Sequence, residues 1–431
     1  MNPLHVTLSS SVDATYEKNK KSIDTVTHDV QRAITQHEAY AHPLSYAYLP
    51  FDNAMHAIIA QCAADIRLQE PALIIAIGIG GSQLGASALY TALQCTIAHA
   101  YVPELLFADT FDVLHMERII KRMHDLLRVG KKVIIVGVTK SGTTAETVAN
   151  MQVCIDQLKL YDTSWREAVV VITDPGSPLD IYAQQATLMR LPIPLAVGGR
   201  YSVFSAAGLF VCALVGIDID QLCAGARDIT QLLFDQPDLH DAIRMALFKY
   251  QAYCAGCVVH DYFMFCPALA GVGAWWRQLA GESLGKVDAQ GNAVALVPTV
   301  SVGTTDLHSI AQRYLGGAHT IATTFVSVDQ MPIDYTITAR GVTTVVPSLV
   351  DQSLQSLMRA ALQATMHAYD AVGIPYTHVQ LTTLKPYYLG QFLQLSLLEM
   401  VYLGSLLGVN PFDQPHVELY KTQMRKILAH E

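Results

Sequence analysis

A repeated alternation of short apolar runs and longer helical segments between residues 72 and 190 most constrains the fold of this chain. The apolar runs predict strands at 73–77, 105–108, 132–138 and 168–173. Helical segments follow them at 83–97, 111–128, 144–160 and 178–187. Alternation of this kind predicts an α/β fold in which helices cover both faces of a parallel sheet. Ligands of such sheets bind at the carboxyl ends of the strands.

A second alternation follows a connector that contains Pro192 and Pro194. Its predicted helices are 202–216, 221–234, 239–257, 350–372, 386–407 and 414–429, and its predicted strands are 262–266, 294–302, 321–328 and 378–383. The first seventy residues are predicted as helices at 12–37 and 53–68. We therefore expect a helical segment over 1–70 that packs on two sheet domains, 71–190 and 198–431.

The region from Pro71 to Pro103 has no charged residue, and its length alone would allow a membrane helix. Its internal pattern favours a different structure. A β-branched run is followed by the glycine-rich turn 78–82 and then by an alanine-rich helix. This order predicts a strand, a loop and a helix inside a soluble domain.

The charge balance argues against two classes of partner. The chain of 431 residues has 28 Lys and Arg against 37 Asp and Glu, a net charge of -9, and its one basic cluster is 18–21. We expect neither nucleic acid nor an acidic membrane as a partner, and a small molecule as substrate.

The cysteines and the start of the chain indicate a cytoplasmic protein. Eight cysteines occur without a framework spacing, most of them in apolar runs, which is typical of reduced core thiols. The first residues lack the basic and apolar pattern of a secretory signal. Cys254 and Cys257 have the spacing of a redox or zinc half-site, but a second pair is missing, so a metal is not expected.

The segment 139–144, Thr-Lys-Ser-Gly-Thr-Thr, is a candidate phosphate site. It offers four hydroxyls and consecutive backbone N–H groups at a predicted helix start, where the helix dipole favours an anion. Ordinary N-capping by one hydroxyl is the alternative. The turn 78–82 would let a ligand approach the main chain, but Gln83 breaks the dinucleotide fingerprint.

Glu282 is the candidate base. It lies among apolar and small residues in the segment 278–286, and a carboxylate partly removed from water gains proton affinity. The alternative is an amphipathic helix that ends at Gly285 and leaves Glu282 in solvent.

Together with further segments in a fixed order, these motifs resemble the glucose-6-phosphate isomerase (phosphoglucose isomerase) family in its shorter bacterial form. The segments are 78–82, 139–144, 198–202 (Gly-Gly-Arg-Tyr-Ser), 281–286, 306–309 (Asp-Leu-His-Ser) and 410–421. The resemblance implies two α/β/α sandwich domains of the sugar isomerase (SIS) type in a homodimer. It also implies reversible conversion of glucose 6-phosphate to fructose 6-phosphate through a cis-enediolate, with neither metal nor organic cofactor.

The resemblance implies a role for each matching residue. Glu282 would transfer the proton between C2 and C1, and Arg200 would stabilise the enediolate. His308, supplied by the partner subunit, and Lys421, paired with Gln414 by spacing, would open the sugar ring. The substrate-binding residues would be Thr139, Lys140, Ser141 and Thr144 for the phosphate, and Gly81, Ser82, Gln278 and Gln414 for the sugar.

Two departures and two alternatives accompany this interpretation. His416 stands where the family usually has glycine, and Gly281 where a larger or acidic residue is common. Both leave the reaction rate and the fine substrate specificity undetermined by the sequence.

Two alternative functions are compatible with parts of this pattern. A dual-specificity phosphoglucose/phosphomannose isomerase could use the same residues. A sugar-phosphate-sensing regulatory protein would need the phosphate loop, but would not need Glu282, His308 and Lys421 together.

Overall fold

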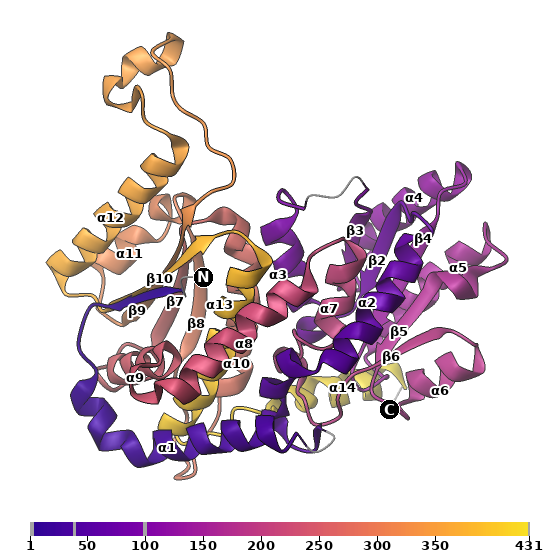
Figure 1. Ribbon diagram of the computed structural model, residues 1–431, viewed down its shortest axis with the longest axis horizontal. Coiled ribbons are helices and arrows are strands. Elements are labelled where there is room, and N and C mark those ends of the chain that lie inside the picture. The colour runs from indigo at the N-terminus through magenta and orange to yellow at the C-terminus, as the bar shows by residue number, and fades with distance from the viewer. Residues whose placement is uncertain (1–3, 38–39, 98–100, 430–431) are drawn as a thin grey trace.

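The protein folds around two five-stranded sheets that lie side by side (Figure 1). The computed structural model describes residues 4–37, 40–97 and 101–429. The outer limits of the predicted domains, residues 1 and 431, lie outside these ranges. The predicted fold class, parallel sheets flanked by helices, is confirmed.

The first sheet has the order β3-β2-β4-β5-β6, and all its pairs are parallel. Its strands are β2 (Leu73–Ile77), β3 (Glu104–Ala108), β4 (Val133–Val138), β5 (Val169–Thr173) and β6 (Met189–Pro192). Every residue of β2, β4 and β5 is buried, which explains why these strands are continuous apolar runs.

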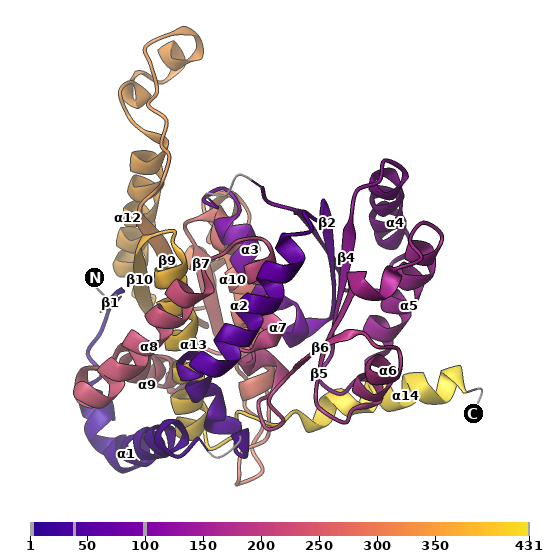
Figure 2. The ribbon, with the colours of Figure 1, turned by 45° about the vertical axis from the view of Figure 1, so that its right-hand side comes forward.

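Helices cover both faces of the first sheet. They are α2 (Asn53–Arg67), α3 (Leu84–Leu93), α4 (Val113–Arg128), α5 (Ala145–Lys159), α6 (Pro178–Gln185) and α7 (Ala206–Leu214). Figure 2 shows α4, α5 and α6 on one side of the sheet and α2, α3 and α7 on the other. The uncharged region from Pro71 onwards forms β2, the short turn Gly80–Ser82 and α3, as predicted. In the described ranges, no helix is long and apolar enough to cross a membrane.

The second sheet has the order β1-β10-β9-β7-β8. Its strands β7 (Val259–Met264), β8 (Val297–Val302), β9 (Ile321–Gln330) and β10 (Tyr376–Thr383) are parallel, and β1 (His5–Leu8) pairs antiparallel with β10. Alternate residues of β7 face opposite sides, since Phe263 packs in a satellite core while Tyr262 and Met264 join the main core.

The remaining helices pack around this second sheet or extend from it. They are α1 (Asp13–Thr35), α8 (Ile219–Asp235), α9 (Asp241–Cys254), α10 (Ala270–Leu284), α11 (Ala311–Gly316), α12 (Leu354–Val372), α13 (Pro386–Leu406) and α14 (Glu418–Leu428). The central helix α13 is buried from Tyr387 to Gly404 and packs against α8 and α9.

Two strands correct the sequence predictions. Residues 5–8, predicted within a helical segment, form β1, and 189–192, predicted as a connector, form β6. Both strands have four residues and lie at sheet edges, where partial exposure breaks the apolar pattern. Pro192 is tolerated in β6 because an edge strand can spare a hydrogen bond.

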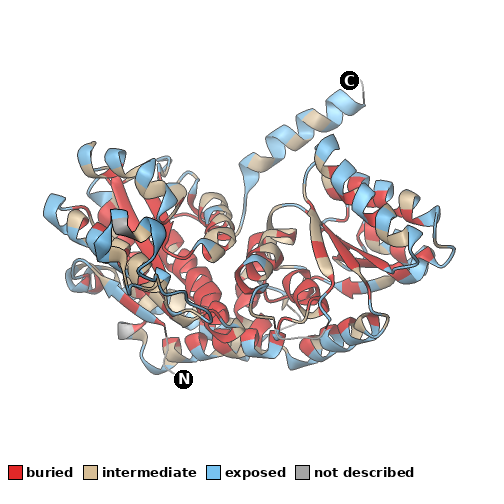
Figure 3. Cartoon of the chain, turned by 90° about the horizontal axis from the view of Figure 1, so that it is seen from above, coloured by how far each residue is buried: buried red, intermediate tan, exposed pale blue. Residues whose placement is uncertain are grey.

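Two segments project from the body. Residues 331–353, which we call the arm, extend away from the second sheet between β9 and α12 (Figure 1). The C-terminal helix α14 projects in another direction, and its residues are exposed or half-buried (Figure 3). Both segments therefore present surface that the rest of the chain does not cover.

Candidate active site

Arg200 is the centre of the candidate site. It belongs to the short turn Gly199–Tyr201, and its side chain is only 1% exposed. One guanidinium nitrogen, Nη1, lies 3.2 Å from Glu282 Oε2 and 2.6 Å from Gln414 Oε1. The other, Nη2, donates to the carbonyl oxygens of Pro411 and Asp413 at 2.6 and 2.9 Å. Arg200 thus joins α10 to the loop that precedes α14.

Glu282 is held from two sides. Its side chain is 27% exposed, Oε1 accepts from Gln278 Nε2 at 2.9 Å, and Oε2 accepts from Arg200. Gln278 and Glu282 are four residues apart on α10 and therefore share one face of the helix. The carboxylate is oriented, yet part of it faces solvent. The prediction that apolar residues surround the carboxylate of Glu282 is wrong, because the guanidinium of Arg200 and the amide of Gln278 flank it.

The helix of the alternative interpretation is present, since α10 ends at Leu284 with Gly285 as its C-cap. The interpretation is wrong in leaving Glu282 as a solvated surface residue. Arg200 and Gln278 both hold its carboxylate.

The turn after β2 packs directly on Arg200's loop. A Cβ added to Gly81 would lie 2.2 Å from the carbonyl carbon of Gly199 and 2.5 Å from the nitrogen of Arg200. Only glycine allows this approach. Ser82, the next residue, is half-buried. Gly81, Gln278 and Gln414 are therefore brought together around Arg200 and Glu282.

The segment 139–144 lies between β4 and α5, at the carboxyl edge of the first sheet. Thr144 is the N-cap residue of α5 but makes no side-chain cap bond; its hydroxyl pairs with Thr139 Oγ1 at 2.8 Å. Ser141 is exposed, and its Oγ accepts from the backbone N–H of Thr143 at 3.3 Å. Ordinary capping therefore does not account for the hydroxyls.

Lys140 is half-buried in the same loop, and burial lowers the pKa of its ammonium group, opposed by Asp174. Burial raises the pKa of Asp174 to about 6, against the influence of Lys140. The predicted anion site is therefore flanked by the cation of Lys140 and by Asp174, a carboxyl group with a raised pKa.

His308 does not meet Glu282 within this chain. It ends the short helix Thr305–His308 after β8 and is exposed. Asp306 orders this turn, because its carboxylate accepts from the N–H of Val302 at 2.7 Å and from Ser309 Oγ at 2.8 Å. Among the described residues, the side chain of His308 has neither a hydrogen-bond partner nor an ion-pair partner.

Lys421 is also away from Glu282, and its predicted pairing with Gln414 is wrong. Its ammonium group binds Glu418 Oε1 at 2.8 Å, one turn earlier on α14, whereas Gln414 binds Arg200. The projecting direction of α14 explains the separation (Figure 2).

Sequence reasoning missed three residues of the cluster. Ser283 Oγ accepts from Arg200 Nε at 2.9 Å and lies 3.1 Å from the hydroxyl of Tyr201. Lys286 binds the loop 410–413 through two carbonyl oxygens. For Lys286, the signal in the sequence was its spacing of four residues from the candidate base Glu282.

The cysteines show no metal centre in the described part of the chain. No group of three or more His, Cys, Asp or Glu there could hold a metal ion, and all eight cysteines are free. Cys254 is exposed at the end of α9, whereas Cys257 is buried. The spacing of this pair therefore gives no support to a zinc or redox site.

Comparisons with known proteins agree with this geometry. A family model described as "Phosphoglucose isomerase" matches residues 68–431. A glucose-6-phosphate isomerase of Symbiobacterium thermophilum is 33% identical over 397 residues, which cover 88% of this chain and 85% of that protein. A glucose-6-phosphate isomerase of Thermus thermophilus is 32% identical over 362 residues, 82% of this chain and 83% of that protein.

Two solved structures have the same overall fold. A hypothetical protein of Thermus thermophilus aligns with a TM-score of 0.88 and 27% identity, over 99% of this chain and 100% of its own. A glucose-6-phosphate isomerase of Chlamydia trachomatis aligns with a TM-score of 0.83 and 19% identity, over 99% of this chain and 88% of its own. Since the family model spans most of the sequence, this chain belongs to the phosphoglucose isomerase family.

Proposed function

We propose that the site around Glu282 performs the reaction of the family, the reversible isomerisation of glucose 6-phosphate and fructose 6-phosphate in glycolysis and gluconeogenesis. The observation behind this proposal is the pairing of a partly exposed carboxylate with a buried guanidinium. Glu282 takes the proton from C2 of the open-chain aldose and returns it at C1. The reaction passes through a cis-enediolate, and neither metal nor cofactor is expected.

Arg200 is proposed to stabilise the negative charge of the enediolate. All five of its hydrogen bonds fix the guanidinium before substrate arrives. A charge that needs no reorganisation during the reaction lowers the barrier most effectively. Gly81, Ser82, Gln278 and Gln414 are proposed as sugar contacts, because Gln278 binds the carboxylate, Gln414 binds the guanidinium, and the turn of Gly81 and Ser82 packs on the backbone of Arg200.

A coupled assay tests the reaction. Purified protein is mixed with fructose 6-phosphate, and glucose 6-phosphate is detected by a dehydrogenase that is specific for it. Absence of product would overturn the proposal. The same assay with mannose 6-phosphate distinguishes a dual-specificity enzyme. The sugar-phosphate-sensing alternative is not favoured, since the curated relatives are named as isomerases.

The loop 139–144 is proposed to hold the phosphate through Thr139, Lys140, Ser141 and Thr144. We expect Ser141→Ala combined with Thr144→Ala to raise KM for fructose 6-phosphate by roughly 100-fold or more, because each of the two lost bonds to a charged group costs about 1.5–3 kcal/mol. Binding of an unphosphorylated polyol inhibitor should stay unchanged.

Initial-rate kinetics with inorganic phosphate as competitor measures this effect, and Thr163→Ala, an exposed threonine, is the matched control. An unchanged KM without phosphate competition would place the anion elsewhere.

A homodimer is proposed, with His308 supplied across the interface to open the sugar ring together with Lys421. The exposure of His308 supports this arrangement, since its side chain has no bonding partner in the part of its own chain that the structure describes. Lys421 needs a movement of α14 or a second copy, because it lies away from Glu282 and binds Glu418 instead.

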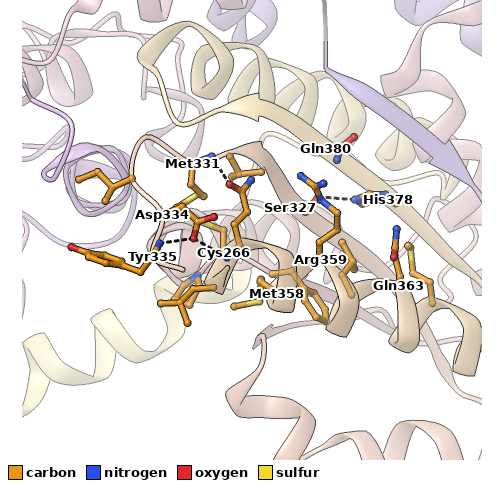
Figure 4. A pocket seen from close by; sticks show the side chains of 18 residues that line it. Cys266, Ser327, Met331, Asp334, Tyr335, Met358, Arg359, Gln363, His378 and Gln380 are labelled. Carbon is orange, nitrogen blue, oxygen red and sulfur yellow. Dashed lines mark hydrogen bonds between the residues drawn. The ribbon is translucent and has the colours of Figure 1, made fainter. Parts of the chain in front are cut away.

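The arm gives independent support to a dimer. Its tip exposes Val342 and Val345, which are 86% and 80% exposed. At its base an apolar cavity of about 330 Å³ opens between the arm, β9 and α12, lined by residues that include Met331, Tyr335 and Met358 (Figure 4). A second copy is the proposed occupant, because a two-fold axis would bury both patches of each chain at once.

Mixing two inactive variants tests the shared site. His308→Ala and Glu282→Gln protomers, denatured together and reassociated, should regain about a quarter of wild-type activity, because half of the dimers are mixed and each has one intact site. Activity is measured after mass analysis of the dimers. No recovery in confirmed mixed dimers would contradict the proposal.

A cytoplasmic location is also proposed, on the ground that all eight cysteines are free.

A further inference from the structure

Lys286 makes a contact that the proposed mechanism does not use. It lies two residues beyond the end of α10, and its side chain is 8% exposed. Its ammonium group donates to the carbonyl oxygens of Asn410 and Asp413, the latter at 2.7 Å, and lies 2.7 Å from Asp413 Oδ1. An ammonium group has three N–H donors, so these three acceptors satisfy it completely.

The loop that Lys286 binds connects α13 to α14. Arg200 binds the same loop, and the carbonyl oxygen of Asp413 accepts from both cations. The loop is ordered within itself, since Asn410 Nδ2 donates to Asp413 Oδ2 at 2.9 Å and the N–H of Phe412 donates to Asn410 Oδ1 at 3.0 Å. It is therefore a rigid segment that two cations fix to the end of α10.

The two cations share the carbonyl oxygen of Asp413 but otherwise bind different residues of this segment. Arg200 binds Gln414 directly, so the amide stays in place without Lys286. Lys286 alone binds Asn410, the first residue of the segment 410–414. Burial lowers the pKa of Lys286, opposed by Asp413, which agrees with a cation enclosed by the loop.

We infer that Lys286 is a positioning residue that fixes the loop 410–413 on the end of α10 and, with Arg200, sets the point at which α14, the helix that carries Lys421, begins. This inference rests on the proposed function and deepens it. The proton-transfer base and the anchor of α14 lie one turn apart, at the end of one helix. Lys286 and Arg200 therefore both fix the segment from which α14 leaves the body.

Three variants separate this role from an ordinary ion pair. Lys286→Met removes all three contacts. Asp413→Asn removes the charge of a side chain that is 53% exposed, but keeps the carbonyl oxygen that Lys286 binds. Lys286→Arg keeps a cation at the same place and should restore part of the activity.

We expect Lys286→Met to lower kcat for fructose 6-phosphate by roughly tenfold with little change in KM, since contacting residues couple on this scale. Asp413→Asn should lower kcat by less than about threefold, because exposed ion pairs contribute little to stability. In a Lys421→Ala background, Lys286→Met should have almost no further effect on ring-closed substrate. A full additional tenfold loss in that background would overturn the inference.

A second measurement does not depend on activity. Hydrogen exchange of the backbone amides in 410–417 should be faster in Lys286→Met than in wild type, and unchanged in Asp413→Asn. Equal exchange in all three proteins would also overturn the inference. If the wild type fails to isomerise the sugar while the exchange differs as expected, the proposed function fails and the anchoring contact stands.

Discussion

Replacement of Glu282 by glutamine should lower kcat by about 10² to 10⁴, the range for a positioned acid–base group. Glutamine keeps the size of the side chain and an oxygen that can accept from Arg200 or Gln278. Arg200 also keeps its four other hydrogen bonds, so the fold and the phosphate loop should be retained, and KM should change little. The loss falls on proton transfer alone, because an amide cannot take up the C2 proton.

Two measurements check this result. Initial rates give kcat, and NMR follows the exchange of deuterium at C2 with solvent, which should stop in the variant. Glu117→Gln, at an exposed position on α4, is the matched control and should retain full activity. A Glu282→Gln enzyme with more than a tenth of wild-type turnover would refute the assignment of the base.

Replacement of Arg200 by methionine should have the second large effect, and it should act on stability as well as on rate. The side chain is 1% exposed, and its removal takes one donor each from the carboxylate of Glu282 and from the carbonyl oxygens of Pro411 and Asp413. Losing a hydrogen bond to a charged group costs about 1.5–3 kcal/mol. The free energy of unfolding should fall by that amount, and activity should disappear.

Urea unfolding followed by circular dichroism measures the loss of stability. Arg200→Lys tests whether a positive charge alone is sufficient, because an ammonium group has three donors whereas the guanidinium of Arg200 makes five hydrogen bonds. It should recover part of the stability and little of the rate. A stability loss below about 1 kcal/mol, the value of an exposed pair, would contradict the structural role of Arg200.

The sequence predicted the strands that are buried on both faces and missed β1 and β6, one edge strand of each sheet. In β2, β4 and β5 every position is buried, so selection for apolar residues leaves a continuous run. In β1 only Val6 is buried, and its strand partner Val379 lies more than 370 positions away. The residues next to β1 in the sequence therefore do not indicate that it pairs with such a distant strand.

The candidate site was predictable only where its contacts join residues that are close in the sequence. Gln278 and Glu282 are one helical turn apart, and their bond follows from local geometry. Arg200 and Gln414 were identified only through the resemblance, because the contact between them depends on the whole fold. The separation of Lys421 from Gln414 could not be predicted, since spacing along the chain does not give the direction in which α14 leaves the body.

The contacts of Arg200 also have a consequence for biosynthesis. They join residues that are 82 and 214 positions apart, whereas the five strands of the first sheet all lie before residue 193. On a ribosome, the first sheet and its loop 139–144 are therefore complete long before Gln414 is synthesised. The proposed reacting groups therefore come together only after Gln414 has been synthesised, and a shorter nascent chain lacks the complete site.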